Sequence, residues 1–418
     1  MKVLVIGGGG REHAIVWKLS LSPRVKKIWC LPGNAGIAEL AECVNIGATD
    51  IDGVVEFSRM NRPDLVVVAP DDPLVMGMTD RLHEAGFRAF GPSKNAAVIE
   101  GSKSFAKELM KKYNIPTAKY AVFEDFSKAR AYIEAEGAPI VIKADGLALG
   151  KGVVVASSVD EAVEAAREML EGGKFGKSGA RVVVEECLEG PEVSVLCFTD
   201  GKIVVPMPPA QDHKRAYDLD QGPNTGGMGA FAPSPKYTPE IAEICMETII
   251  RPTVKAMAKE GRPFKGVLYF GLMLTKDGPK VIEYNCRFGD PETQAVLPLL
   301  DGDLIDIFEA VIDERLDEAD IKWKSGACCC VVMASGGYPA TYPTGLEISG
   351  LEATKEAGGL IFHAGTKAHG GKMLTAGGRV LGVCGEGDNL AEAISAAYGY
   401  VEKISFEGAH FRKDIGRK

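Results

Sequence analysis

The sequence predicts a multidomain protein of mixed α/β and α+β class, and three observations support that prediction. The first hundred residues alternate short apolar runs with helical stretches, a pattern typical of a doubly wound parallel sheet. From residue 101 onward, strands are joined by glycine-rich connections, and a small β-rich module follows from residue 326. The length of 418 residues leaves room for about two to four domains.

The composition is that of an ordinary globular protein. With 46% hydrophobic and 25% charged residues, it excludes a disordered or fibrous chain. The 48 Lys and Arg against 57 Asp and Glu give a net charge of −9, without a long basic block, so we expect no nucleic-acid partner. The 50 glycines exceed the usual share of about 7%, which indicates loops that approach ligands closely.

The cysteines and the N-terminus indicate a cytoplasmic location. The ten cysteines contain no C-x-x-C pair, and buried, reduced thiols explain them better than a metal or redox site does. Met1 and Lys2 lead directly into an apolar strand, which leaves no room for a signal peptide. Since no apolar run approaches the length of a membrane span, we also expect no membrane partner.

The first hundred residues contain four expected strands with helices between them. The strands are 3–6, 27–31, 65–69 and 88–90, and the helices lie near 12–19, 53–59 and 78–85. In a parallel sheet of this kind, ligands bind at the carboxyl ends of the strands.

A glycine-rich turn, Gly7 to Gly10, follows the first strand and opens a helix, so its amides form an anion site. A dinucleotide fingerprint needs a third glycine, where this chain has Glu12 or His13. The second strand also lacks the acid that would hold a ribose, which argues against a nicotinamide dehydrogenase. A purely structural turn stays open beside a phosphate or substrate loop.

The central part reads as a small α+β unit with a lid, followed by further strands and a last module. Strands are expected at 118–123, 139–143, 153–156, 181–186, 192–198, 266–274, 280–284, 327–334 and 380–384, and helices at 102–113, 158–170, 241–259 and 390–400.

Two motifs suit a nucleotide. Lys143 and Lys151 flank a glycine-rich loop, 146–152, whose mobile amides can wrap phosphates, although it is no Walker loop. Solvated lysines at an ordinary hairpin turn would explain it equally well. In the stretch 182–194, a strand enters a short connector that offers backbone groups to an adenine edge, and Glu192 could take the ribose hydroxyls. Ordinary acidic residues beside strands remain the alternative.

The stretch 283–292 has the densest chemistry. Glu283 and Asn285 are two apart in an extended chain, so their oxygens face one side and form a natural Mg²⁺ clamp. Arg287 has the same parity and could reach a phosphoryl group or carboxylate bidentately. Surface decoration explains three such side chains on one strand face less well.

The stretches 211–215 and 222–229 lie in loop-forming sequence. Acid, imidazole and cations mixed in this way suit an amino-acid zwitterion, and loops on a rigid scaffold carry function. A solvated turn is the alternative.

Taken together, the motifs resemble those of the ATP-grasp ligases, and specifically the phosphoribosylamine–glycine ligase (glycinamide ribonucleotide synthetase) family of purine biosynthesis. The resemblance covers essentially the whole chain, and the set in this order is highly specific. It rests on GGGGREH, PGNAG, GSK, DGLALGKGV, VVVEE with GPEVS, QDHKR, GPNTGGMGA and RFGDPETQ.

The resemblance implies an N-terminal (pre-ATP-grasp) domain at 1–100, an ATP-grasp domain at 101–325 with a lid subdomain near 120–190, and a C-terminal domain at 326–418. It implies metal ligands Glu283 and Asn285. The implied ATP-binding residues are Lys103, Lys143, Gly150, Lys151, Gly152, Glu185, Glu186, Leu188 and Glu192. We expect Gly9, Arg11, Glu12, Asp71, His213, Gly226 and Gly227 to bind substrate, and Arg287, Asp212, Lys214 and Asp290 to act in catalysis. Asp71 stands where the family usually has Glu, so its reach is shorter.

The reaction implied is the ATP-dependent ligation of glycine to 5-phosphoribosylamine through glycyl phosphate, with Mg²⁺ or Mn²⁺. We expect a monomer or weak homodimer. The rival interpretations are another ATP-grasp carboxylate–amine ligase or carboxylase of purine metabolism, and a non-catalytic nucleotide-binding regulator.

Overall fold

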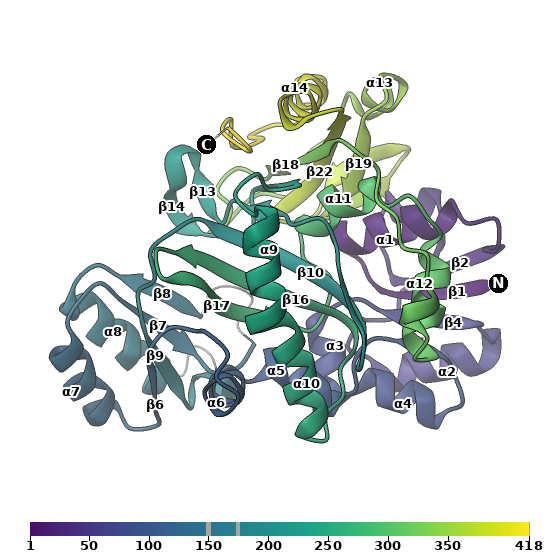
Figure 1. Cartoon of the computed structure of the whole chain (residues 1–418). Helices are drawn as coiled ribbons and strands as arrows, with labels where there is room; N and C mark the ends of the chain where they lie inside the picture. Colours follow the sequence, from purple (N-terminus) through teal and green to yellow (C-terminus); the bar gives the residue numbers. More distant parts are fainter. Residues whose placement is uncertain (148–151, 173–175, 418) are drawn as a thin grey trace.

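The computed structural model describes residues 1–147, 152–172 and 176–417, so two expected ATP-binding residues, Gly150 and Lys151, lie outside it. Figure 1 shows the N-terminal region and the lid on opposite sides of a central sheet, with the C-terminal region above both. Among the described residues, no helix is both long and apolar enough to cross a bilayer. The ten cysteines are free thiols, and eight are buried.

The N-terminal region is a parallel sheet of order β3-β2-β1-β4-β5, as expected from the alternating pattern. Its elements are β1 (Lys2–Gly7), α1 (Gly10–Ser20), β2 (Lys27–Pro32), β3 (Glu42–Cys43), α2 (Ile51–Asn61), β4 (Leu65–Val68), α3 (Asp71–Met76), α4 (Met78–Glu84), β5 (Ala89–Phe90) and α5 (Lys94–Gly101). Strand order reverses between β1 and β4, so the loops after these two strands border one crevice. The structure therefore places Gly9 and Asp71 at the same edge.

The central sheet is antiparallel, of order β11-β10-β16-β17. Its strands are β10 (Glu192–Asp200), β11 (Val204–Pro206), β16 (Lys265–Thr275) and β17 (Gly278–Asn285). The helix expected at 241–259 is confirmed as one uninterrupted helical run, in which a π-helical turn at Met246–Ile250 joins α9 (Pro239–Cys245) to α10 (Arg251–Lys259). The side chain of Thr238 caps α9, and the helices lie across the sheet in Figure 1.

The lid is a separate antiparallel sheet of order β6-β9-β7-β8 with two helices against it. Its elements are β6 (Tyr120–Phe123), α7 (Phe126–Glu136), β7 (Ile140–Ala144), β8 (Val153–Ala156), α8 (Val159–Leu170) and β9 (Val182–Glu186). Small and branched side chains from these elements form a hydrophobic core of their own. Helix α6 (Lys103–Lys112) connects α5 to the lid.

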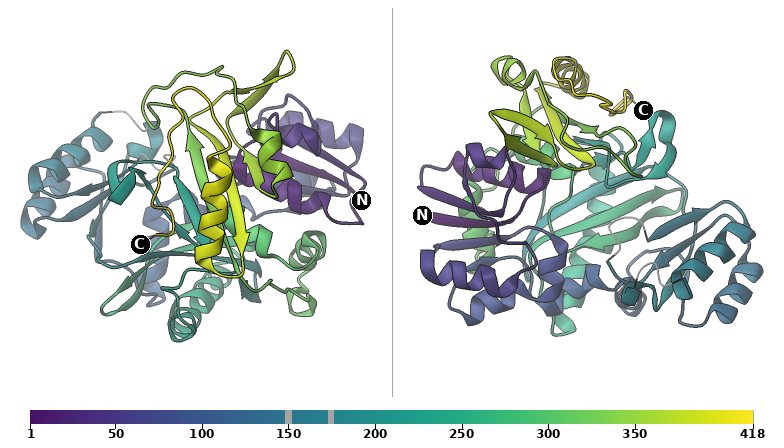
Figure 2. Two further views of the ribbon diagram at one scale, coloured as in Figure 1. Left: turned by 90° about the horizontal axis from the view of Figure 1, so that it is seen from above. Right: turned by 180° about the vertical axis from the view of Figure 1, so that it is seen from behind.

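A third sheet joins chain segments that are far apart in sequence, in the order β12-β15-β18-β22-β19. Its strands are β12 (Gln211–Asp212), β15 (Gly229–Ala232), β18 (Ala327–Ala334), β19 (Leu360–His363) and β22 (Arg379–Gly387). The sheet thus includes residues from both sides of the 325/326 limit, and the domain limits stay a prediction. The hairpin β13 (Arg215–Tyr217) and β14 (Gln221–Asn224) projects beside it (Figure 2).

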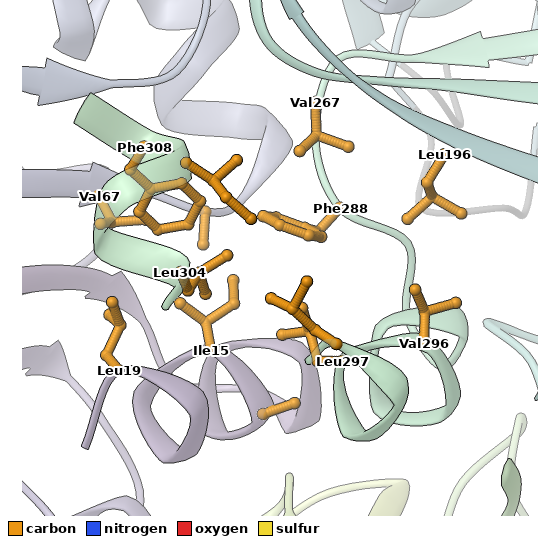
Figure 3. Close-up of a cluster of buried hydrophobic side chains, with 14 of the residues drawn as sticks. Ile15, Leu19, Val67, Leu196, Val267, Phe288, Val296, Leu297, Leu304 and Phe308 are labelled. Atoms are coloured by element: carbon orange, nitrogen blue, oxygen red, sulfur yellow. The ribbon is translucent and has the colours of Figure 1, made fainter. Parts of the chain in front are cut away.

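The largest core runs through three regions of the chain. Figure 3 shows Ile15 of α1, Val67 of β4 and Leu196 of β10 in this core, which also includes buried residues of the C-terminal strands. Phe90 and Phe308 stack within it at a ring distance of 3.9 Å. The remaining elements are α11 (Glu292–Val296), α12 (Leu304–Ile312), α13 (Leu351–Glu356), β20 (Thr366–His369), β21 (Lys372–Thr375) and α14 (Leu390–Val401). The body therefore packs around shared apolar contacts, whereas the lid does not.

Candidate active site

The first half of the site lies between α6 and the lid sheet, and we call Lys103, Lys107, Lys143 and Glu185 the nucleotide half. Lys143 of β7 donates to Glu185 Oε2 at 3.0 Å and to the Ile282 carbonyl at 3.0 Å. Lys107 of α6, which the sequence analysis missed, lies 2.8 Å from the same carboxylate oxygen. Burial lowers the pKa of Lys107 to about 8 even though Glu185 opposes the shift.

Lys103 begins α6 and is tied to the glycine-rich connection of the lid. Its ammonium donates to the Gly146 carbonyl at 2.9 Å, and its amide donates to the Asp145 carbonyl at 2.9 Å. The Asp145 carboxylate accepts the Ser104 amide at 2.6 Å, an interaction suited to a helix N-terminus. Burial lowers the pKa of Lys103. Gly152, the last residue of the connection, accepts the Ala144 amide at 2.8 Å.

Three more expected nucleotide residues border the connector between β9 and β10. Glu186 is exposed and accepts the Lys119 amide at 3.1 Å, while Leu188 lies in the connector itself. Glu192 starts β10, and its carboxylate lies 3.3 Å from Lys214 Nζ. Their contacts to an adenosine stay a prediction, but all three lie where β9 passes to the central sheet.

Glu283 and Asn285 both lie on β17, as expected for a metal clamp. Lys214 Nζ lies 3.3 Å from Glu283 Oε1, and mainly this charge lowers the pKa of Glu283 to about 2, so the carboxylate is ionised. A charged carboxylate beside an amide oxygen fits Mg²⁺. Among the described residues, no group of three or more His, Cys, Asp or Glu could hold a metal, so a cation here would share oxygens of its substrates.

The expectation that Arg287 shares that strand is wrong, because β17 ends at Asn285. The guanidinium nevertheless returns to the strand end, where Nη2 donates to Asn285 Oδ1 at 3.0 Å. It also lies 3.1 Å from Glu100 Oε1 and 3.6 Å from Asp71 Oδ2. Burial opposes the charge of Arg287, yet these two carboxylates outweigh it and raise its pKa.

Glu100 is a site residue that the sequence analysis missed, although it directly precedes the Gly101-Ser102-Lys103 motif. It lies in the last turn of α5, is buried, and its Oε2 accepts the Cys286 amide at 2.7 Å. Burial raises its pKa, while Arg287 opposes the shift. Glu100 thus holds both the backbone and the side chain of the residues that follow β17.

The glycine-rich turn after β1 binds its own helix. The Gly9 amide donates to Glu12 Oε2 at 2.6 Å, and Arg11 Nε donates to Glu12 Oε1 at 2.6 Å. Arg11 also reaches the Phe288 carbonyl at 3.3 Å. Asn34, of the PGNAG motif, donates to the Gly8 carbonyl at 2.9 Å and to the His363 carbonyl at 2.7 Å. The turn is therefore braced against the central and C-terminal regions.

Asp212 and its neighbours do not lie in a simple loop, contrary to expectation. Asp212 belongs to β12, which pairs with β15, and His213 and Lys214 follow it. Asp212 Oδ1 is buried and accepts no hydrogen bond from the described residues. Burial, reinforced by Glu292, raises the pKa of Asp212 well above its usual value. Glu292, also missed from sequence, accepts hydrogen bonds from two hydroxyls, those of Ser194 at 3.1 Å and Tyr269 at 3.0 Å.

Asp290 and the 226–227 glycines complete this second half of the site. Asp290 forms an ion pair with Arg379 of β22 at 3.0 Å, a residue that no sequence pattern indicated. The carboxylates of this part outnumber its cations. We call Asp71, Glu100, Asp212, Arg287, Asp290 and Arg379 the acceptor half.

The arrangement joins two kinds of chemistry. The nucleotide half carries three lysines against one carboxylate, which suits an anionic polyphosphate. Glu283, Asn285 and Lys214 lie between the halves. Arg287 stands where charge on a transferred group could be stabilised. The activation of an acid by a polyphosphate is chemistry that these groups can perform.

Comparisons with known proteins agree with that chemistry. Family models of phosphoribosylglycinamide synthetase match in three parts: the N domain at 1–100, the ATP-grasp (A) domain at 101–293 and the C domain at 328–418. The phosphoribosylamine–glycine ligase of Halalkalibacterium halodurans is 52% identical over 100% of this chain and 97% of its own length. The trifunctional purine biosynthetic protein adenosine-3 of Gallus gallus is 50% identical over 99% of this chain and 42% of that protein.

Solved structures give the same picture. The phosphoribosylamine–glycine ligase of Thermotoga maritima has a TM-score of 0.88 and 35% identity, covering 99% of this chain and 100% of that chain. A biotin carboxylase domain of Hydrogenobacter thermophilus, with a TM-score of 0.76 and 17% identity over 98% of this chain and 91% of its own, shares the fold.

Proposed function

This chain belongs to the phosphoribosylglycinamide synthetase family, and on that premise we propose that it ligates glycine to 5-phosphoribosylamine with ATP, giving glycinamide ribonucleotide, ADP and phosphate in purine biosynthesis. The observation that carries the proposal is the row of polar groups from the lysines around Glu185, through Glu283 and Asn285, to Arg287. This row supports a polyphosphate site beside a site for an acid and an amine.

In this proposal the nucleotide half binds ATP. Lys103, Lys143 and Lys151 offset phosphate charge, and Gly150 and Gly152 allow the backbone to approach it. The connector that follows Glu185 and Glu186 and contains Leu188 offers backbone groups to the adenine, and Glu192 takes the ribose hydroxyls. The positive charge of Lys107 offsets the negative charge of Glu185, so this carboxylate repels the phosphates only weakly.

Glycine carboxylate attacks the γ-phosphoryl group in line, the bond to the bridging oxygen of ADP breaks, and glycyl phosphate forms as ADP leaves. Arg287 and Lys214 stabilise the charge that develops on the transferred group and on the acyl oxygen. Glu283 and Asn285 would hold a divalent cation, which supplies further charge neutralisation when bound. Mg²⁺ suits this oxygen pair, and use of Mn²⁺ stays a prediction.

The amine of phosphoribosylamine then attacks the acyl carbon and releases phosphate. Gly9, Arg11, Glu12 and Asp71 border the ribosylamine side, and Asp212, His213, Gly226, Gly227 and Asp290 border the glycine side. An acyl phosphate is lost to hydrolysis in water, so closure of the lid over the site should precede transfer. A cytoplasmic location and a monomer or weak homodimer remain predictions.

The direct test measures phosphate release from Mg-ATP with each substrate added or omitted. Phosphoribosylamine is made in situ from ribose 5-phosphate and ammonia. We expect turnover only when glycine and phosphoribosylamine are both present, and no stimulation by bicarbonate or formate. Turnover with bicarbonate alone would favour a carboxylase, and ATP binding without glycine-dependent turnover would contradict the ligase proposal.

A further inference from the structure

The C-terminal region holds Gly226 through both its amide and its carbonyl, which is part of the peptide between Gly226 and Gly227. The Gly226 amide donates to Tyr338 Oη at 3.1 Å, and Arg379 Nη1 donates to the Gly226 carbonyl at 2.6 Å. The Gly227 amide donates to Thr225 Oγ1 at 3.0 Å. Both glycine N–H groups are therefore used within the protein, and these glycines shape the site instead of donating hydrogen bonds to a substrate.

Arg379 connects this peptide to a second loop. Its Nη1 also donates to the Asp290 carbonyl at 2.9 Å, and its Nη2 lies 3.0 Å from Asp290 Oδ2. The other carboxylate oxygen of Asp290 accepts from Gln294 Nε2 at 2.7 Å. A planar guanidinium with several donors can hold two loops at once, which a lysine ammonium cannot do with the same geometry.

The close packing around the two glycines transmits this contact to Asp212. A Cβ at Gly226 would lie 3.0 Å from Arg379 Cζ, so the guanidinium lies directly against the peptide. Gly227 has a φ of +113°, and a Cβ there would lie 2.7 Å from Asp212 Oδ1. The peptide thus fills the space between Arg379 and Asp212 without a gap.

We propose that Arg379 is a positioning residue for the ligation: by clamping the 226–227 peptide to the loop at Asp290, it sets the two carboxylates Asp212 and Asp290 on the glycine side. The inference rests on the proposed function. The side chain is 20% exposed, so the clamp is largely shielded from water. In this arrangement the C-terminal domain forms a wall of the site. Substitution of Arg379 should therefore leave nucleotide binding unchanged.

The kinetic test compares Arg379→Gln and Arg379→Lys with Asn389→Ala in the full chain. Asn389 caps α14 in the same region, so its loss destabilises that region without touching the site. We expect kcat/KM for glycine to fall about 100-fold in R379Q. In R379K, kcat/KM should stay below about a tenth of the wild-type value, because lysine does not reproduce the guanidinium geometry. The Kd for ADP should stay within about twofold, and N389A should lower Tm while keeping wild-type kinetics. Wild-type glycine kinetics in R379Q, or an equal loss of ADP binding, would overturn the inference.

Amide hydrogen exchange tests the clamp independently of turnover. In the free protein, R379Q should speed exchange at least about tenfold in peptides covering 222–232 and 287–294, whereas N389A should not. Unchanged exchange in both peptides of R379Q would refute the clamp. If the wild-type protein shows no glycine-dependent turnover, the proposed function fails, and the exchange result still decides whether Arg379 holds the two loops together.

Discussion

The two halves of the site differ in how they are assembled. The nucleotide half is built from α6 and the lid strands, which are close in sequence, and two of its lysines, Lys107 and Lys143, converge on the carboxylate of Glu185. The acceptor half takes its groups from the N-terminal sheet, from the loops around β17 and from β22. One half is a local motif with excess positive charge; the other is a junction of three regions with excess negative charge.

The halves also differ in the packing that supports them. The lid has its own core, so it can shift without breaking the core of the body. The acceptor half rests on the large shared core, whose packing fixes the N-terminal, central and C-terminal regions relative to one another. From this difference we infer that movement of the lid controls substrate entry and closure of the site, while the packing of the body fixes the geometry of amine transfer.

Glu283→Ala should have the largest effect, because Glu283 lies between the halves and serves both. We expect turnover to be abolished at any Mg²⁺ concentration, while the circular dichroism spectrum and Tm show an intact fold. Loss of this ionised carboxylate removes one of the two ion-pair partners of Lys214. A divalent cation would then have only the amide oxygen of Asn285 from the expected pair of ligands. Normal Mg²⁺-dependent activity in the variant would rule out the metal assignment.

Arg287→Lys should affect the acceptor half alone. Lysine cannot reach Glu100, Asp71 and Asn285 together, so we expect kcat to fall by about 10²–10³-fold. ADP affinity, measured by calorimetry, should change less than about threefold, because this residue does not touch the lid. Arg262→Lys, on a surface contact to Asn95, is the matched control and should behave as wild type. An equal loss of ADP binding in R287K would remove the distinction between the halves.

The buried contact between His13 of α1 and His363 of β19 should make the protein sensitive to acid. Burial lowers the pKa of His13 to about 3 and that of His363 to about 4, from 6.5. Both rings are thus neutral when folded, and the unfolded chain takes up protons below about pH 6.5. The free energy of unfolding that these neutral rings contribute is fully present above that pH and is lost as the pH falls. At pH 5 the loss is about 2 kcal/mol per histidine.

Urea denaturation at pH 7 and pH 5 measures this loss. The two rings together cause part of the difference in unfolding free energy between pH 7 and pH 5. His363→Gln and His13→Gln should each remove about half of that part, because glutamine does not titrate. Identical pH dependence in both variants and wild type would show that carboxylates alone cause the acid loss.

Lys107→Met should have the smallest effect and should affect the nucleotide half alone. Glu185 would keep Lys143 but lose its shorter contact, so more negative charge would face the phosphates. We expect KM for ATP to rise about tenfold, roughly 1.4 kcal/mol, with KM for glycine unchanged. Lys111→Met, exposed on the same helix, should not change either constant. A larger change for glycine than for ATP would contradict the division of the site.

The sequence predicted the nucleotide half better than the acceptor half, and the reason is physical. Lys143 and Glu185 lie near the ends of two strands that apolar runs in the sequence predict. Glu283 and Asn285 are two residues apart on one strand, so their side chains share a face. Glu100 meets Arg287 from 187 positions away, and Arg379 reaches Asp290 from 89 positions away. Pairs at such separations are created by packing of whole regions, which no local pattern records. The doubly wound sheet and the lid follow from periodicity, whereas the third sheet, which mixes strands from 211–232 and 327–387, does not.

That third sheet has a consequence for synthesis of the protein. Strand β15 pairs with β18, whose first residue leaves the ribosome about a hundred residues later, a delay of roughly 5–20 s at common elongation rates. Until then, one edge of β15 offers unpaired backbone groups to any neighbouring nascent chain. A chain that ends between β17 and β18 has all the strands of its central sheet but lacks the C-terminal wall of the glycine side. Such truncated chains are expected to aggregate, so a slow codon cluster there would reduce the yield of intact protein more than one placed after β22 (Arg379–Gly387).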